Sequence, residues 1–201
     1  MTSGRRLAVA IGIGLLTVFG SLSAAQAQYR GQRPYYGPPP MAPRGVYRHG
    51  LTLGGSIGGG AITSDGCGPF CGAAGMIEGH IGGMLNPRLA LMGDFWGSAH
   101  RWDDGLGTGT TYHGIYTLAL QYWVTDILWL KGGAGFAQLN FGYDGTANPD
   151  ENGPGILGAI GIEVVQAYNF ALDLQFRLGH GFYDTGPDVS NIGFMVGVNW
   201  Y

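Results

Sequence analysis

The chain has 201 residues, the length of one domain with a tail, and 40 of them are glycine. Only 11% are charged, against roughly 25% in an ordinary soluble domain, so a sheet of this chain has too few charged residues for a solvent-exposed face. All 13 acids follow His49, where only Arg88, Arg101, Lys131 and Arg177 oppose them, and an acidic body disfavours nucleic acid as a partner.

The N-terminal segment reads as a secretory signal. Arg5 and Arg6 precede an uncharged apolar run, 7–22, and the following "SAAQAQ" contains the small-x-small pattern of a cleavage site. We therefore expect residues 1–27 to be a signal peptide, with an uncleaved membrane anchor as the alternative. No later segment reaches the ~18 uncharged apolar residues of a membrane helix.

Residues 28–50, rich in Pro, Arg, Tyr and Gly, show no hydrophobic period. This composition is typical of a disordered or polyproline spacer, and we expect the spacer to lie in the periplasm. A tail that binds an anionic polymer is the alternative.

From residue 51 onward apolar residues recur at every second position, which predicts β-strands. There are eight such segments and no helical period among them. Strands are expected at 51–61, 73–85, 88–100, 111–124, 127–142, 155–166, 170–183 and 190–201. Each is long enough for a tilted strand to cross a membrane, which takes about nine to eleven residues.

The connections alternate in length. "LNPR", "VTDI" and "QAYNF" are tight, whereas the other four, for example "RWDDGLGTGT" and "YDGTANPDENGPG", are long and polar. Short turns at one end and long loops at the other are typical of an outer membrane barrel. The sequence therefore predicts an all-β fold, an eight-stranded antiparallel up-and-down transmembrane β-barrel, over residues 51–201.

The stretch "FALDLQFRLGHGFY", residues 170–183, shows which face is inside. Phe170, Leu172, Leu174, Phe176 and Leu178 alternate with small or polar residues. In a membrane barrel the apolar row meets lipid and the polar row meets the lumen. A soluble barrel with the faces reversed would expose a Gly- and Ala-rich surface with little charge, which makes a poor wet face.

The charged residues of the inner rows are expected to form one lumenal polar network. Turns centred on Asn86, Asp126 and Tyr168 set Glu78 opposite Asp94, Gln121 opposite Lys131 and Glu163 opposite Asp173. Because like charges cannot face each other unpaired in a dry interior, the two bases must approach the acids diagonally. Four acids then meet only two bases, so we expect one protonated carboxyl or a charged His80. The network consists of Glu78, Asp94, Lys131, Glu163, Asp173 and Arg177.

Three further sets of residues carry expectations. Cys67 and Cys71, in "DGCGPFCG", are expected to form a disulfide that staples a loop, with a metal site as the weaker alternative. A metal site from Glu78 and His80 with His100 or His113 is a second weak alternative, so we expect no metal and no cofactor.

Aromatics near the short-turn end are expected to form a membrane-interface belt: Tyr122, Trp123, Trp129, Phe170 and Trp200.

The signal peptide, the eight strands, the loop asymmetry and the aromatic ending "IGFMVGVNWY" together resemble the small eight-stranded outer membrane proteins, such as the transmembrane domain of outer membrane protein A and its X and W relatives. The resemblance covers residues 51–201. It implies a monomer in the Gram-negative outer membrane, in contact with membrane lipid and lipopolysaccharide. It also implies assembly by the barrel-assembly machinery through the last strand, although Asn199 stands where an aromatic is usual.

Function does not follow from this architecture, which serves many roles. We expect a structural or binding role in membrane integrity and display of surface loops. A narrow channel for small or hydrophobic solutes is the first alternative and a lipid A-modifying enzyme the second. We expect no enzyme, because Ser98 and His100 face the lumen and His180 has no neighbouring serine in its strand.

Overall fold

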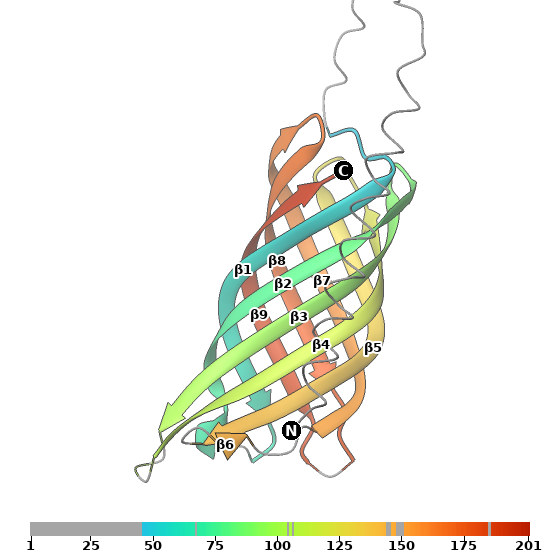
Figure 1. The fold of residues 1–201 in the computed structure, drawn as a ribbon. Helices are drawn as coiled ribbons and strands as arrows, with labels where there is room; N and C mark the ends of the chain where they lie inside the picture. Colours follow the sequence, from blue (N-terminus) through green and yellow to red (C-terminus); the bar gives the residue numbers. More distant parts are fainter. Residues whose placement is uncertain are drawn as a thin grey trace, which may run out of the picture. The chain divides into compact units, whose positions relative to one another are not determined.

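A computed structural model describes residues 46–66, 68–103, 105, 107–143, 146–147, 151–184 and 186–201. The segment from Pro43 to Tyr201 is one compact unit. Within the described part, eight long strands and one short strand make up the sheet (Figure 1). The strands are β1 (Leu51–Ser64), β2 (Gly72–Asn86), β3 (Leu89–Asp103), β4 (Thr108–Trp123), β5 (Leu128–Tyr143), β6 (Thr146–Ala147), β7 (Glu151–Ala167), β8 (Phe170–Gly181) and β9 (Val189–Trp200).

The sheet closes on itself. Each long strand pairs antiparallel with its neighbours in the chain, and β1 also pairs with β9, from Leu53 opposite Trp200 to Ser64 opposite Val189. In Figure 1 the strands of the near wall run obliquely to the barrel axis, and the strands of the far wall, drawn fainter, cross behind them. The predicted fold class, an eight-stranded antiparallel up-and-down barrel, is confirmed.

The predicted loop asymmetry holds for the connections that follow β1, β5 and β8, which are longer than the turns that follow β2, β4 and β7. The connection that follows β3 is shorter than predicted, because β3 continues to Asp103 and β4 begins at Thr108, so that residues 104–107 span no more positions than the turn 124–127 after β4. Two small elements in the long connections were not predicted, the 3-10 turn η2 (Gly68–Phe70) and the strand β6. Neither could be recognised from alternation, because each is too short to contain two repeats of the two-residue period.

The outer face of the barrel is apolar. Ile57 and Phe194 are 70% and 69% exposed, whereas Ser56 before Ile57 and the residues on both sides of Phe194 are buried. Tyr112 and Tyr122 both point outward from β4, 122 − 112 = 10 positions apart. At ~3.4 Å per residue and a tilt of about 45°, they are roughly 24 Å apart along the axis, close to the ~25 Å apolar band of membrane barrels. The outer face is thus a lipid-facing surface.

Two bulges adjust the strand register. The expected pairs Gln121 with Lys131 and Glu163 with Asp173 are present. Glu78, however, lies opposite Trp96, and Asp94 lies opposite His80. The expected pairing of Glu78 with Asp94 is therefore wrong, because the turn centres on Pro87–Arg88 and a bulge lies between Met84 and Asn86.

Side chains fill the lumen in layers. Toward the long loops lies an apolar cluster that includes Trp96, Ile115, Leu139 and Met195. Toward the short turns lies a second, built on Met92, Trp123 and Trp129. Large polar residues, among them Arg177, are completely buried between and beside these clusters. An eight-stranded barrel has an interior just wide enough for such filling.

The start of the described chain belongs to the barrel. The Tyr47 N–H donates to the carbonyl of Tyr168 at 2.8 Å, and the two rings stack at 5.5 Å. Tyr47 and Arg48, which precede the predicted start of the barrel at residue 51, thus contact the barrel. The predicted signal peptide, 1–27, and residues 28–45 of the predicted spacer lie outside the described residues. In the part of the chain that the structure covers, we find no helix long and apolar enough to cross a membrane.

Candidate functional site

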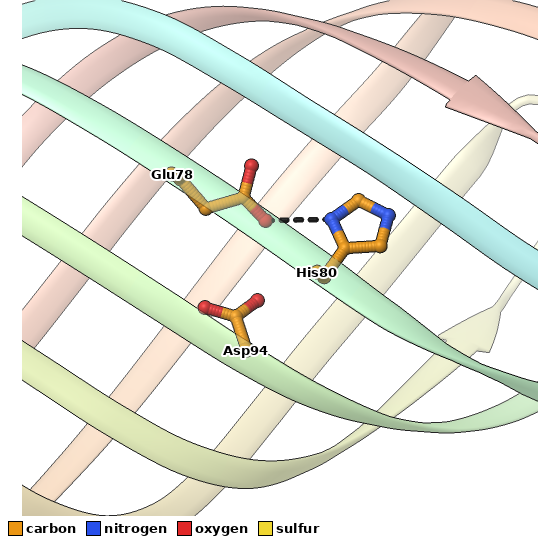
Figure 2. Close-up of side chains that lie close together, drawn as sticks. All are labelled: Glu78, His80 and Asp94. Atoms are coloured by element: carbon orange, nitrogen blue, oxygen red, sulfur yellow. Dashed lines mark hydrogen bonds and ion pairs between the residues drawn. The ribbon is translucent and has the colours of Figure 1, made fainter. Parts of the chain in front are cut away.

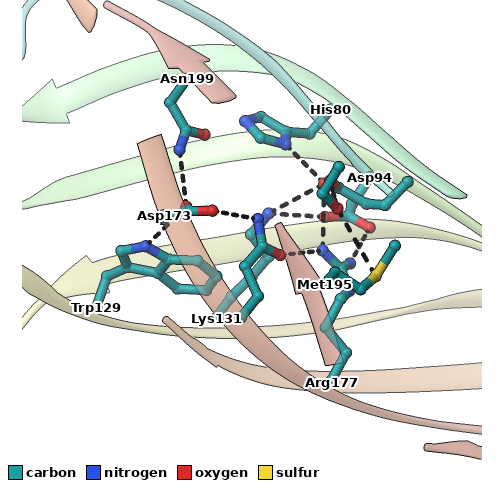
Figure 3. Close-up of polar contacts among 11 residues, drawn as sticks. His80, Asp94, Trp129, Lys131, Asp173, Arg177, Met195 and Asn199 are labelled. Atoms are coloured by element: carbon teal, nitrogen blue, oxygen red, sulfur yellow. Dashed lines mark hydrogen bonds and ion pairs between the residues drawn. The ribbon is translucent and has the colours of Figure 1, made fainter. Parts of the chain in front are cut away.

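An ion-pair cluster lies across the middle of the lumen. Arg177 in β8 donates through Nη2 to Asp94 Oδ1 at 2.6 Å, and Lys131 in β5 donates to Asp94 Oδ2 at 2.8 Å (Figure 3). Arg177 Nη1 also lies 3.2 Å from Glu78 Oε1. These residues come from four strands, β2, β3, β5 and β8, which surround one lumen, so groups far apart in sequence meet. Each buried charge here has a partner of opposite sign, as burial requires.

Glu78 gathers further donors. Its Oε1 lies 2.6 Å from His80 Nδ1, and its Oε2 accepts from the Ser56 hydroxyl at 2.7 Å. Figure 2 shows Glu78 and His80 on one strand and Asp94 on the next, with all three turned toward a common point.

This trio has the donor types of a metal site, since one ligand atom of each residue lies within 4.8 Å of the others. Lys131 and Arg177 already neutralise both carboxylates, however. A divalent cation would have to displace them, so the geometry favours an ion-pair cluster over a metal centre.

Asp173 joins the cluster through neutral groups. Its carboxylate accepts from Gln175, Asn199 and the indole N–H of Trp129 at 2.8, 2.8 and 3.2 Å. Gln175 in turn accepts from Arg177 at 3.2 Å. We call the set of Glu78, Asp94, Lys131, Asp173, Gln175 and Arg177 the central cluster.

Glu163 forms a separate site near the short turns. One carboxylate oxygen accepts from Arg48 at 2.5 Å and from Gln166 at 2.6 Å, and the other accepts from Trp123 and from the Tyr201 hydroxyl, both at 2.8 Å. Four donors on one buried carboxylate satisfy nearly all its lone pairs. We call these five residues the end clasp, because they join both ends of the barrel's chain.

Arg48 is the central member of the end clasp. Its guanidinium lies 4.8 Å from the Trp123 ring and 5.6 Å from the Tyr201 ring, and it also donates to the carbonyl of Asp126 at 2.7 Å. Stacking on two aromatic rings suits the planar, weakly hydrated guanidinium. Burial, together with the nearby Glu163 carboxylate, raises the pKa of Tyr201 far above its usual range, so Tyr201 remains a hydrogen-bond donor.

The structure thus brings five of the six predicted network residues into one cluster and places Glu163 in another. The predicted shortage of bases is largely resolved by Arg48, which no strand pattern indicated. The unbalanced count of four acids to two bases was the sequence signal that a further cation was needed. The prediction also missed three residues that stand at inward-pointing positions of their strands: Ser56, Gln175 and Asn199.

The predicted interface belt is wrong for two residues. Trp123 and Trp129 are 0% and 1% exposed and lie in the lumen, where their indole N–H groups donate to Glu163 and Asp173. Trp123 follows the outward Tyr122, and Trp129 precedes the outward Leu130. Because successive side chains of a strand point to opposite faces, both tryptophans point inward. Tyr122 and Trp200 do point outward, both at 46% exposure, and Phe170 packs against Trp200 with ring centroids 5.5 Å apart.

The rim near the long loops holds a second constellation. His180 in β8 lies directly opposite Ser190 in β9, and its Nδ1 is 2.8 Å from the Ser190 hydroxyl. Asp188 Oδ2 lies 3.7 Å from His180 Nε2. The expectation that His180 lacks a serine holds only within its own strand, because the partner comes from the next strand.

The other histidines of the rim are occupied differently. His113 is completely buried in the lumen, with its ring centroid 6.0 Å from that of Tyr183. His100 Nδ1 lies 2.8 Å from the carbonyl oxygen of Ala73. The predicted disulfide stays a prediction, because Cys67 lies outside the described residues.

The closed barrel, with its apolar outer face and filled, ion-paired lumen, has the fold of the small eight-stranded outer membrane β-barrels. No protein-family model matches the chain, and no curated protein matches it. Solved structures do. The attachment invasion locus protein Ail of Yersinia pestis is similar over 76% of this chain and 98% of its own, with 14% identity and a TM-score of 0.52. Neisserial surface protein A is similar over 75% and 95%, with 16% identity and a TM-score of 0.52. At this identity the likeness concerns the fold.

Proposed function

We propose that the protein is a non-conducting barrel of the Gram-negative outer membrane, with a structural or binding role and with its long loops on the outside. The observation that carries this proposal is the closed lumen. The central cluster crosses it as a charge-paired partition, and apolar side chains pack on both sides. Buried apolar side chains and paired charges across the lumen oppose a continuous water path.

The fold supports the location, because its apolar outer band and one-sided long loops suit an outer membrane. The acidic loops and the outer face are the surfaces available for lipid, lipopolysaccharide or a partner. We expect the barrel to act as a monomer, delivered by the barrel-assembly machinery through β9.

Conductance tests this proposal. Purified protein inserted into planar bilayers should give no steady current, or only rare small openings, in symmetric potassium chloride. Heat-modifiable migration on a gel shows in parallel that the inserted protein is folded. A stable single-channel current from folded protein would favour the narrow channel instead. Recovery of the chain in the soluble periplasmic fraction would contradict the location.

A second candidate function, a lipid-acting acyl hydrolase, rests on His180, Ser190 and Asp188. Serine beside histidine, with a carboxylate beyond, is the arrangement that activates a hydroxyl nucleophile. His180 would take the proton as Ser190 Oγ attacks an ester carbonyl, and would return it to the departing alkoxide. Water, activated in the same way, would then cleave the acyl-serine and release the fatty acid.

The mass of lipid A from cells that express the protein tests this candidate. Loss of one acyl chain that Ser190→Ala abolishes would support it. Ser98→Ala is the matched control, because Ser98 is buried in the lumen and donates to the His113 carbonyl. An unchanged acyl count with folded wild-type protein would exclude lipid A as the substrate.

A further inference from the structure

A groove of about 710 Å³ lies on the outer face toward the long loops, mainly over β2, β3 and β4, with Gln138 and Asn140 of β5 at one side and Gly58 of β1 at the other. Its floor is nearly bare backbone, because Gly75, Gly97 and Gly114 stand where the outward rows elsewhere carry larger side chains. A Cβ built on Gly75 meets no atom within 4 Å. The volume is within the range of ligand sites in proteins, about 300–1,000 Å³.

Aromatic rings wall the groove on its side toward the short turns. Phe95 and Tyr116 have ring centroids 4.9 Å apart, and Tyr116 stacks on Phe136 at 4.7 Å. Tyr112 stands at the side toward the long loops and points outward. The groove is therefore a mostly apolar slot, with Gln138 and Asn140 as its polar side chains, and it is continuous with the lipid-facing surface. A hydrocarbon chain is the occupant that this surrounding supplies.

A cation stands just beyond the groove. Arg101 is two residues past Ala99, which lines the groove, and it is exposed on the same outward face of β3. Two residues of a strand cover roughly 7 Å. A lipid whose chain occupies the groove thus brings its headgroup to Arg101, and a guanidinium binds phosphate through paired hydrogen bonds.

We propose that this groove is a binding site for one acyl chain of a phosphorylated lipid of the outer leaflet, with Arg101 on the lipid phosphate. The proposal rests on the proposed function, because it takes the long-loop end as the outside of the membrane. It adds a defined site to a contact with lipid that any membrane barrel makes.

Lipid binding by variants that fill the groove tests the proposal. Folded protein in detergent is titrated with purified lipid A, and the bound fraction is measured by native mass spectrometry. Gly75→Leu puts a side chain into the slot and should weaken binding about tenfold, the loss expected when roughly two methylene groups lose their contact. Gly114→Val, which occupies another part of the floor, should act in the same direction.

The chain offers a matched control. Gly132 in β5 also faces lipid, and a Cβ built there also meets no atom within 4 Å, but it does not line the groove. Gly132→Leu should therefore leave binding within twofold of wild type, and Arg101→Gln should weaken it. Phosphatidylethanolamine in place of lipid A shows whether the phosphate-rich headgroup matters, and we expect it to bind more weakly.

Equal binding by Gly75→Leu and wild type, or equal loss in Gly75→Leu and Gly132→Leu, would overturn the proposal. Heat-modifiable migration of each variant verifies that it is folded. Lipid binding is measured on purified protein and therefore does not depend on where the protein lies in the cell. Recovery of the chain outside the outer membrane would contradict the proposed function and leave the lipid-binding result unchanged.

Discussion

At the scale of single residues, Arg177 holds the central cluster together. Its side chain contacts Asp94, Glu78 and Gln175, and it is completely buried. Arg177→Leu leaves two buried carboxylates with Lys131 as their remaining strong cation. Removing one partner of a buried ion pair costs about 3–5 kcal/mol. We expect the temperature of heat-modifiable migration in detergent to fall markedly.

Two controls separate this effect from a general loss of charge. Arg88→Leu, at the exposed turn after β2, should leave the transition unchanged. Arg177→Leu with Asp94→Leu should cost less than the sum of the single changes, because the unpaired carboxylate is also removed. A melting temperature of Arg177→Leu equal to wild type would show that Arg177 does not brace the barrel.

The alternation of inward and outward positions along each strand predicted part of the site from the sequence. The other residues were missed for reasons that differ from residue to residue. Asp94, Lys131 and Arg177 alternate with apolar neighbours, so their inward direction could be read directly. Trp123 and Trp129 were assigned by residue type, yet an indole N–H with a buried carboxylate acceptor is stable inside. Arg48 precedes the first strand and has no periodic neighbours, so only the charge imbalance pointed to it.

At the scale of the strand, close backbone contact explains why β1 is rich in glycine. Gly60 faces inward, and a Cβ built on it would fall on the backbone carbonyl of Ile192 in β9. The barrel closes at this seam, so the two backbones cannot move apart freely. Gly60→Ala should destabilise the barrel by about 1–3 kcal/mol, as overpacking does. Urea unfolding, followed by tryptophan fluorescence in detergent, measures the change.

Gly132→Ala provides the comparison, because its added methyl group points into open space on the outer face. We expect it to be neutral within a few tenths of a kcal/mol. If Gly60→Ala and Gly132→Ala unfold at the same urea concentration, then glycine at the β1–β9 seam serves no steric need.

Strand positions could be predicted more closely than strand register. Alternation located all eight long strands, because a two-residue period persists over many residues. Register depends on where each turn centres and on bulges, which leave no periodic trace. Glu163 faces Asp173 as expected because the bulge between Glu163 and Val165 offsets a turn that centres half a residue later than predicted, whereas the turn at Pro87–Arg88 moved the partner of Glu78 by two residues, from Asp94 to Trp96.

At the scale of the whole barrel, two polar sites lie in series along one lumen. The end clasp ties Arg48 and Tyr201 to Glu163 near the short turns, and the central cluster lies farther in, beyond the layer that holds Trp129. A passage is only as open as its narrowest point. Loss of the clasp alone should therefore loosen the barrel without opening it.

Arg48→Ala should lower the thermal transition in detergent, because Glu163 loses its one cation while three neutral donors remain. A cost of about 2–4 kcal/mol is expected for a buried carboxylate that keeps its other hydrogen bonds. Planar bilayers should still show no steady current, because the central cluster is intact. Adding Arg177→Ala removes the larger obstacle and leaves hydrated carboxylates behind, so only the double variant should give small openings. Steady conductance from Arg48→Ala alone would mean that the clasp, rather than the central cluster, is the barrier across the lumen.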